Sequence, residues 1–476
     1  MNALTWSGQP WPLQCLSALL ALWAVAHILL TKRDHPAASL GWVVIVVLLP
    51  LLGVVIYGWL GINRVQRRAR QMRPAQKAVI KPARFSGQIA EHLYPLAELG
   101  RHSSRRALTN NHQIDILHNG EQTYPAMLAA INKAQKQIWL STYIFDTDAS
   151  GRAFIDALAA AHARGVEVRV LIDGVGELYA WPRASRLLRR RQVPCARFLP
   201  LRLFAFTMYS NLRNHRKLLL VDAAQAFFGG MNIGDRHVLA ANKRTACDVQ
   251  FCIRGDLLQQ LGELFARDWH FATDETLSLL PAAATQARPV QNAEPLLARL
   301  IADGPDKDLD RLRITLLGAV RAAKQDLVLM TPYFIPADEI VSALKTAALS
   351  GVQVNVLLPA RSNIVLADWA SRALWPALLE AGIKIHLQSA PFVHGKWLLV
   401  DSEYALLGSA NIDERSLRLN YELGVEIYQQ AFVSELQQQS AKMIASARTL
   451  SLQEVQQWSH WRQLRNASAW LAAPYL

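Results

Sequence analysis

The chain has 476 residues, which is enough for more than one domain with a substantial apolar core. Its formal charge of +14 at pH 7 indicates an anionic partner, and nucleic acid, anionic lipid and phosphorylated substrates all meet that requirement. The four cysteines form neither a CxxC pair nor a zinc pattern, which argues against a disulfide framework and a cysteine-based metal site.

Two apolar runs lie near the amino terminus. The first covers Leu13 to Thr31 and the second covers Ala37 to Gly61, with a short polar turn between them. A helix needs about 20 residues to cross the hydrocarbon core of a bilayer, so both runs are predicted to be transmembrane helices. The first run exceeds the usual apolar core of a signal peptide, and no basic residue precedes it. Residues 1–63 are therefore expected to form a transmembrane hairpin.

Basic residues cluster directly after the second run, at Arg64, Arg67, Arg68, Arg70, Arg73 and Lys77. Lysine and arginine near the ends of membrane spans stay on the cytoplasmic side. We therefore interpret residues 64–104 as a basic juxtamembrane linker and expect the remainder of the chain to lie in the cytoplasm. The same charges would attract anionic lipid headgroups.

From about residue 105, segments with helical spacing alternate with segments that have the apolar density of buried strands. In the first half these segments are residues 122–137, 138–145, 151–165 and 165–173; in the second half they are 313–326, 327–335, 339–351 and 351–359. This order predicts an α/β fold with a mixed or parallel sheet in each half. The stretch 281–295 has little periodicity, so the two lobes are predicted at 105–288 and 289–476.

The strongest signal is the pattern His-x-Lys-x4-Asp, which occurs once in each half and is followed each time by a tetrapeptide ending in Asn. The first half contributes His215, Lys217, Asp222, Gly229, Gly230 and Asn232; the second half contributes His394, Lys396, Asp401, Gly408, Ser409 and Asn411. Every equivalent pair is 179 residues apart. Two copies in register indicate a duplicated lobe with one half-site in each copy.

These residue types suit chemistry at a phosphodiester. Alternation along a strand puts the His and the Lys of each motif on one face. Two half-sites around one phosphate would supply two Lys and two Asn donors, so Asn232 and Asn411 are predicted to bind phosphate. No metal ion or other cofactor is then required. One imidazole can attack phosphorus while the other protonates the leaving oxygen.

With these motifs the chain resembles the phospholipase D superfamily, in which two such motifs meet at one active site. Within that superfamily it is similar to bacterial cardiolipin synthases over nearly its whole length. The similarity is carried by YIFDTD (143–148), LIDGVG (171–176), TPYFIP (331–336), GSANIDERSLRLNYE (408–422) and the closing APYL. KRTACD (243–248) and RSN (361–363) depart from the family pattern, which affects the expected substrate preference rather than the reaction class.

The resemblance implies two phospholipase D-like α/β lobes related by pseudo-twofold symmetry and preceded by the hairpin. It implies a phosphatidyltransferase that joins two phosphatidylglycerol molecules into cardiolipin, releases glycerol and passes through a phosphohistidine. It places the chain in a bacterial inner membrane as a multi-pass protein with the lobes facing the cytoplasm. The expected partners are phosphatidylglycerol and anionic membrane lipid, without nucleic acid.

Individual roles follow from the same resemblance. His215 is expected to be the nucleophile and His394 the general acid and base, although the sequence is nearly symmetric between them. Asp248 and Glu422 resemble the acidic residues that accept the other ring N–H of each histidine. Asp222 and Asp401 are included among the catalytic residues, but they end their strands and need not carry protons.

Several alternatives remain open. A phospholipase or a different phosphatidyltransferase, such as a phosphatidylserine synthase, would use the same motifs with another acceptor or donor. The hairpin disfavours a nuclease, and two intact half-sites disfavour a non-enzymatic scaffold. The carboxyl-terminal segment with Trp458, Trp461 and Trp470 suits either the membrane interface or ordinary packing on the second lobe. The sequence leaves the oligomeric state open.

Overall fold

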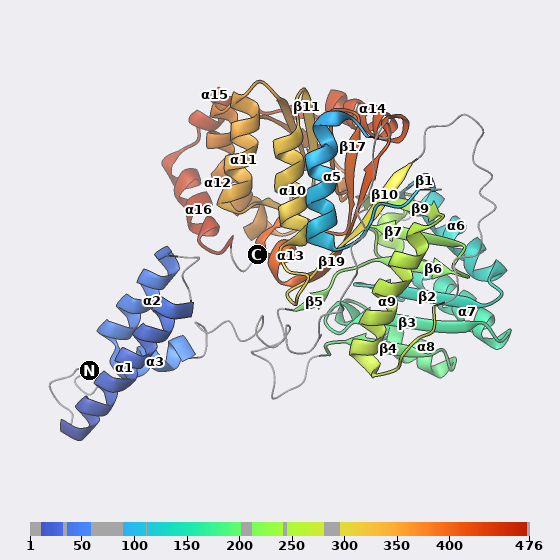
Figure 1. Ribbon diagram of the computed structural model, residues 1–476, viewed down its shortest axis with the longest axis horizontal. Coiled ribbons are helices and arrows are strands. Elements are labelled where there is room, and N and C mark those ends of the chain that lie inside the picture. Colours follow the sequence, from blue (N-terminus) through green and yellow to red (C-terminus); the bar gives the residue numbers. More distant parts are fainter. Residues whose placement is uncertain are drawn as a thin grey trace. The chain divides into compact units, whose positions relative to one another are not determined.

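The structure is a computed structural model that describes residues 11–31, 36–58, 89–110, 112–200, 212–240, 245–279 and 296–473. The chain divides into two compact units, residues 1–68 and residues 69–476 (Figure 1). The predicted active-site motifs all lie in the second unit.

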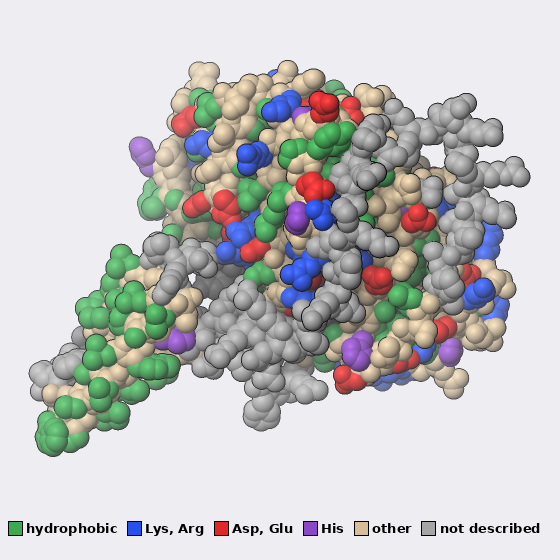
Figure 2. Space-filling model, in the orientation of Figure 1, with side chains coloured by type: hydrophobic (Ala, Val, Ile, Leu, Met, Phe, Trp, Pro, Cys, Tyr) green, Lys and Arg blue, Asp and Glu red, His purple; other side chains and the backbone are tan. Residues whose placement is uncertain are grey.

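The first unit contains three apolar helices, α1 (Trp11–Thr31), α2 (Pro36–Leu48) and α3 (Pro50–Ile56). Most of the exposed side chains of these helices are large and hydrophobic, and Figure 2 shows many of them on one face. By length and composition α1 is able to cross a membrane, and it is the one helix among the described residues that meets both criteria. The basic residues that were predicted to set the orientation lie outside the described residues.

The second predicted span is not one continuous helix, because the run divides at Pro50 into α2 and α3. Proline lacks the backbone N–H that an inner helical turn needs, and its ring clashes with the preceding turn. A Cβ atom at Gly53 would lie 2.5 Å from the carbonyl oxygen of Ile45, so glycine permits a close backbone approach after the break. The prediction of one span over residues 37–61 is therefore corrected to two shorter helices.

The first lobe alternates helices and strands as the sequence predicted. Its strands are β1 (Gln113–His118), β2 (Gln137–Thr142), β3 (Glu167–Asp173), β4 (Cys195–Phe198), β5 (Arg213–Asn214), β6 (Leu218–Val221), β7 (Gln225–Gly229), β8 (Ala246–Cys247) and β9 (Val249–Arg254). Its helices are α6 (Asn119–Lys133), α7 (Ala149–Ala163), η4 (Gly176–Tyr179), α8 (Ala184–Arg190), η5 (Asp235–His237) and α9 (Leu257–Thr273).

The second lobe repeats this order. Its strands are β10 (Leu297–Asp303), β11 (Asp326–Met330), β12 (Phe334–Ile335), β13 (Gln353–Pro359), β14 (Lys384–Gln388), β15 (Phe392–Val393), β16 (Trp397–Val400), β17 (Tyr404–Gly408), β18 (Ile412–Asp413), β19 (Asn420–Tyr428) and β20 (Arg448–Thr449). Its helices are α10 (Arg311–Ala322), α11 (Asp338–Leu349), α12 (Val365–Glu380), α13 (Glu414–Arg418), α14 (Gln430–Ser446), α15 (Leu452–Gln456) and α16 (His460–Trp470).

The two main sheets have equivalent strand orders, β1-β9-β7-β6-β2-β3-β4 in the first lobe and β10-β19-β17-β16-β11-β13-β14 in the second, where β20 adds one further strand. In each sheet three strands are parallel and the rest are antiparallel, so both sheets are mixed. Buried apolar positions on both faces explain why these strands read as continuous hydrophobic runs. The repeated order confirms the predicted duplication.

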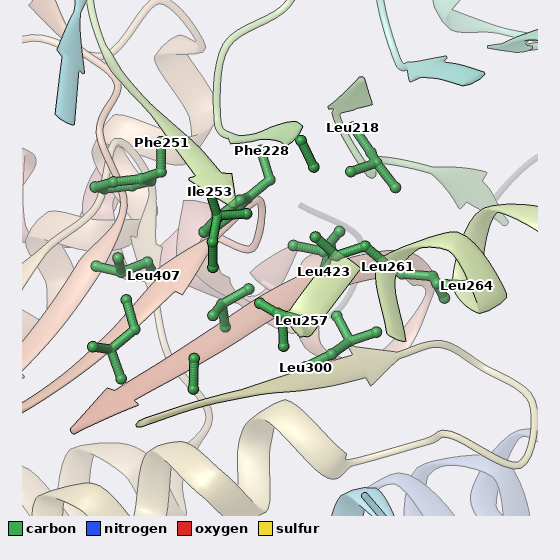
Figure 3. Close-up of a cluster of buried hydrophobic side chains, with 14 of the residues drawn as sticks. Leu218, Phe228, Phe251, Ile253, Leu257, Leu261, Leu264, Leu300, Leu407 and Leu423 are labelled. Atoms are coloured by element: carbon green, nitrogen blue, oxygen red, sulfur yellow. The ribbon is translucent and has the colours of Figure 1, made fainter. Parts of the chain in front are cut away.

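The lobes share one apolar core at their interface, part of which is shown in Figure 3. Helix α9 brings Leu257, Leu261 and Leu264 into this core, and β19 brings Leu423 from the other lobe. The labelled side chains from both lobes are Leu218, Phe228, Phe251, Ile253, Leu257, Leu261, Leu264, Leu300, Leu407 and Leu423. Burial of this much apolar surface holds the two sheets as one body.

Two short strand pairings cross from one lobe to the other. Strand β5 of the first lobe pairs in parallel with β19 of the second, and Asn214 lies opposite Tyr421. Strand β15 of the second lobe pairs in parallel with β8 of the first, and Val393 lies opposite Cys247. These pairings lie immediately before the two motif histidines, so they set the position of the active centre.

Residues 64–104 were predicted to be a linker, but part of this segment is folded into the second lobe. Residues Glu91–Leu93 form the short helix η3 and Tyr94–Ser104 form α5. Helix α5 lies beside α10 (Figure 1), and its Leu96 and Ala97 are buried in the core of that lobe. The amphipathic pattern of α5 explains this packing, because its apolar face needs a covering surface.

The carboxyl-terminal helix α16 packs against α12. Trp470 contacts a small apolar cluster there, and Trp458 is buried. Trp461 is 80% exposed, so packing accounts for only part of the tryptophan-rich segment. Contact of this segment with a membrane stays a prediction.

Candidate active site

The two motif histidines occupy equivalent loops at the boundary between the lobes. His215 connects β5 to β6, and its backbone N–H donates to the carbonyl of Tyr421, at 2.9 Å. His394 connects β15 to β16, and its backbone N–H donates to the carbonyl of Cys247, at 2.8 Å. Each histidine is thus anchored to the residue that immediately precedes a carboxylate of the opposite lobe.

That carboxylate then binds the imidazole. Nδ1 of His215 lies 3.0 Å from the carboxylate of Glu422, and Nδ1 of His394 lies 2.6 Å from Oδ2 of Asp248. The pairs are crossed, because each histidine uses an acid from the other lobe. This is the contact that the sequence analysis expected for Asp248 and Glu422, while their role in catalysis stays a prediction.

Burial sets the charge state of both pairs. Burial lowers the pKa of His215 to about 4, although the negative charge of Glu422 acts to raise it. Burial also lowers the pKa of His394 to about 4, and the positive charge of Lys396 lowers it further. Burial alone would raise the pKa of Glu422, but its interaction and hydrogen bond with the His215 imidazole, the neighbouring Lys217 and the Ser409 hydroxyl outweigh burial and lower that pKa to about 2. Both imidazoles are therefore neutral at pH 7, with the Nδ1 proton directed to a carboxylate and an unprotonated Nε2.

The two motif lysines lie beside their histidines. Nζ of Lys217 donates to the carbonyl of His215 at 2.8 Å, and Nζ of Lys396 donates to the carbonyl of His394 at 2.6 Å. Both side chains are buried, and burial lowers the pKa of Lys217 well below its ordinary value and that of Lys396 to about 8. An anionic group bound next to both imidazoles would stabilise the protonated forms of these two lysines, which makes the centre suited to such a ligand.

Gly230 and Ser409 are equivalent by sequence but support the two acids differently. A Cβ atom at Gly230 would lie 3.0 Å from Nζ of Lys396 and 3.2 Å from Oδ1 of Asp248, so glycine leaves room for these two charged groups. Ser409 instead donates its hydroxyl to Glu422. Glu422 thus has an additional hydroxyl donor, whereas the glycine beside Asp248 supplies none and makes room for Lys396.

The predicted phosphate ligands Asn232 and Asn411 are both buried near the ends of β7 and β17. Oδ1 of Asn232 accepts a hydrogen bond from the backbone N–H of Ile144 at 3.1 Å. This bond fixes the orientation of the side-chain amide, and the NH₂ group takes no part in it. Oδ1 of Asn411 has no hydrogen-bond partner. Phosphate binding by these two residues stays a prediction.

Asp222 and Asp401 were included among the catalytic residues but not as proton carriers, with backbone contacts as their possible role, and both carboxylates make such contacts. Asp222 accepts three backbone N–H bonds from residues 135–137, each at 2.8 Å. Asp401 accepts the equivalent bonds from residues 324–326, at 2.8 to 2.9 Å, and lies 3.0 Å from Nε2 of His92. They lie at the far ends of β6 and β16 from the histidines, so they hold strands in register and are positioning residues.

Sequence reasoning missed three residues near the histidines. The ring of Tyr143 lies edge-on to His215, with centroids 5.2 Å apart. In the second lobe Tyr333 lies one register position further along, and its ring reaches His394 only through Phe392, with centroid distances of 6.2 and 6.0 Å. His237 lies 6.0 Å from His394 between ring centroids, and burial lowers its pKa to about 3. The repeated tyrosine in STYIF and TPYFI was a visible signal for the first two; nothing local marked His237.

No group of three or more His, Cys, Asp or Glu side chains that could hold a metal ion occurs among the residues with described positions. The nearby positive charge comes instead from Lys217 and Lys396. Two neutral imidazoles, two lysine side chains and two fixed carboxylates form an arrangement able to bind a phosphodiester and exchange one of its ester oxygens.

Comparison with known proteins gives a consistent picture. The family model for the cardiolipin synthase PLD-like domain matches residues 127–269 and 316–444, and the phospholipase D-nuclease N-terminal model matches residues 19–61. A cardiolipin synthase from Geobacillus kaustophilus is 33% identical over 85% of this chain and 82% of its own length. One from Alkalihalophilus pseudofirmus is 31% identical over 90% of this chain and 87% of its own length.

A solved structure has a similar fold. The crystal structure of phosphatidylserine synthase from Haemophilus influenzae Rd KW20 superposes with a TM-score of 0.63 and 16% identity, covering 80% of this chain and all of that chain. At this identity the similarity concerns the fold alone. Together with the family model, it confirms the predicted phospholipase D-like fold with two α/β lobes.

Proposed function

We propose a reaction and an order of steps for this chain, which belongs to the cardiolipin synthase family of phospholipase D-like enzymes and is a phosphatidyltransferase. The reaction joins two phosphatidylglycerol molecules into cardiolipin and releases one glycerol. The observation that supports it most directly is the crossed pair of histidine–carboxylate contacts at one buried centre.

In the first step Nε2 of His215 attacks phosphorus of the donor lipid. The bond from phosphorus to the glycerol oxygen breaks, and His394 gives that oxygen a proton. In the second step the free hydroxyl of another phosphatidylglycerol attacks phosphorus, gives its proton to His394 and releases His215. Each phosphodiester consumed is replaced by one of similar energy, so no nucleotide or electron carrier is needed.

His394 must be protonated before it can act as the acid in the first step. In the unliganded centre its pKa is about 4, since burial and Lys396 oppose a further positive charge. A phosphodiester anion between the lysines would partly neutralise them and favour protonation of His394. Donor binding therefore supplies the charge that prepares the acid.

The proposed location is a bacterial inner membrane, with both apolar runs inserted and the two lobes in the cytoplasm. The supporting observations are the apolar surface of α1 and the basic cluster after residue 63, together with a matched amino-terminal family model. Cysteine labelling from each side of sealed vesicles, at residues before α1 and after residue 63, tests both the number of crossings and the orientation.

Mass spectrometry of the products tests the reaction. Purified full-length chain is supplied with phosphatidylglycerol as the sole lipid, and cardiolipin with an equal amount of glycerol is the expected result. Phosphatidic acid as the main product would identify a phospholipase instead. Cardiolipin formed only when another phospholipid is added would identify a different donor.

The assignment of the two histidines has its own test. A nitrophenyl phosphodiester has a good leaving group and needs little protonation, so His394→Ala should still load His215 and then stall. His215→Ala should not be labelled. An adduct on His394 in the His215 variant, with none on His215 in the reciprocal variant, would reverse the roles.

A further inference from the structure

Two short apolar loops occupy equivalent positions in the two lobes. One follows β3, contains the short helix η4 and leads into α8, and the other follows β13 and includes the first turn of α12. We call their exposed side chains the interfacial rim, which consists of Leu178, Tyr179, Trp181, Ile364, Val365 and Leu366. Their exposed fractions are between 41% and 81%, and Trp181 is the most exposed. Large apolar side chains grouped in this way on the surface mark a contact site.

The first loop is connected to the catalytic centre through aromatic rings. The centroid of Tyr179 lies 6.4 Å from that of Tyr143, and Tyr143 lies 5.2 Å from His215. Only one ring therefore separates the rim from the histidine that we assign as the nucleophile.

The second loop has a longer connection to the other histidine, through one hydrogen bond and two rings. Asn363, directly before the apolar residues, accepts a hydrogen bond from the hydroxyl of Tyr333 at 2.7 Å. The ring of Tyr333 lies 6.2 Å from Phe392, and Phe392 lies 6.0 Å from His394. The rim thus flanks both histidines, one loop on each side.

Charge next to the rim indicates the kind of surface it contacts. Helix α8 begins three residues after Trp181 and carries the exposed Arg186, Arg189 and Arg190. Apolar tips followed by arginines suit the boundary of an anionic bilayer, where the tips enter the acyl region and the guanidinium groups stay with the phosphates.

We propose that the interfacial rim inserts into the surface of an anionic phospholipid bilayer and holds the catalytic centre over the headgroups. The proposal rests on the proposed function for the identity of the substrate. A diacyl lipid then reaches the histidines with its acyl chains still among lipids, so only its headgroup must leave the membrane. The rim, rather than the apolar helices of the first unit, sets how the centre meets its substrate.

The first test compares two substrates with one set of full-length variants reconstituted in vesicles. Trp181→Asp/Val365→Asp places a charge on each loop without altering a residue of the catalytic centre. We expect about a tenfold loss of cardiolipin formation from phosphatidylglycerol in the bilayer, because two apolar side chains no longer insert. Release of nitrophenolate from a soluble phosphodiester should stay within about twofold of the parent, since that substrate never enters the membrane.

Leu349→Asp is the matched control. Leu349 is 74% exposed and ends α11, next to the start of β13, whereas the rim lies beyond the other end of that strand. This variant should keep both activities. Unchanged turnover of bilayer lipid in the double variant would overturn the proposal. The rim would then contact a partner other than the bilayer. An equal loss with both substrates would overturn it too, because the loops would then shape the centre itself.

A second readout does not depend on any reaction. A fluorophore is attached at Trp181→Cys, or at Leu349→Cys as the control, in a chain whose exposed Cys15 is replaced by Ser. Lipids with a spin label near the headgroup should quench the fluorophore at 181 at least threefold more than the one at 349. Equal quenching at positions 181 and 349 would overturn the proposal that the rim inserts into the bilayer, whatever lipid the chain synthesises. Strong quenching at 181 without cardiolipin formation supports the rim and refutes the proposed function.

Discussion

Replacing Glu422 with Gln isolates the contribution of one carboxylate to the first chemical step. The amide has nearly the same volume and keeps neutral contacts with Ser409 and Asn420, which both donate to Glu422 in the parent. What it loses is a negative charge whose nearest oxygen lies 3.0 Å from Nδ1 of the imidazole on which positive charge develops during attack, or roughly 4 Å between charge centres. At an effective dielectric constant of about 20 this charge is worth about 4 kcal/mol. The expected loss in the rate of that step is therefore about a thousandfold.

The assay is the pre-steady-state burst of nitrophenolate from a nitrophenyl phosphodiester, which reports loading of His215. Asp248→Asn is the matched variant, because it removes the equivalent acid beside His394. Since a good leaving group needs little protonation, Asp248→Asn should keep the burst within about tenfold and slow the later transfer instead. A burst in Glu422→Gln that is less than about tenfold slower, in a protein that keeps its thermal midpoint, would refute the reasoning.

Three further outcomes are expected. Arg216→Leu should lower the free energy of unfolding by about 3–5 kcal/mol, because it removes one member of the buried Arg216–Asp268 ion pair; the double variant Arg216→Leu/Asp268→Leu should recover most of the thermal midpoint. The folded-state pKa of His215 and His394 is about 4 and that of His237 about 3, below the unfolded value of about 6.5, so stability should be lost as pH falls from about 6.5 to about 4. His237→Gln should reduce the proton uptake on unfolding at pH 5 by about one, as measured by the pH dependence of the midpoint. Catalysis should persist in excess chelator, and a strict requirement for Mg²⁺ or Mn²⁺ beyond effects on lipid packing would contradict the mechanism.

The duplicated architecture was predictable because its signals are local and repeated. The constant spacing between His215 and His394, and between the residues that follow them, predicted two equivalent lobes, and the equivalent strand orders of the two sheets agree with it. The alternation of apolar segments also predicted most of the parallel strands. What local periodicity cannot encode is which distant strands pair. The parallel pairing of β5 with β19 and of β15 with β8 joins residues about 150 to 200 positions apart in the sequence. These two pairings were therefore found only in the structure.

Single residues account for the remaining differences. Pro50 breaks a run whose composition alone indicated one span, because apolar character and helical continuity are separate properties. Asp222 and Asp401 belong to the motif, yet their carboxylates bind backbone N–H groups, a role that residue type and spacing do not distinguish from catalysis. His237 contributes a buried imidazole from the five-residue segment after Asn232, where no pattern in the sequence marks it.

The docking of α5 on the second lobe has a consequence for synthesis on the ribosome. Leu96 and Ala97 leave the exit tunnel early, but α10, which covers them, begins at Arg311. Roughly 200 residues separate the two, so at about 5–20 residues per second the apolar side of α5 waits on the order of 10 to 40 seconds for its partner. The first lobe is synthesised during that interval, while α5 is still uncovered. A nascent chain stalled before residue 311 should therefore expose α5 to a protease or a chaperone, and one stalled after the second lobe should not.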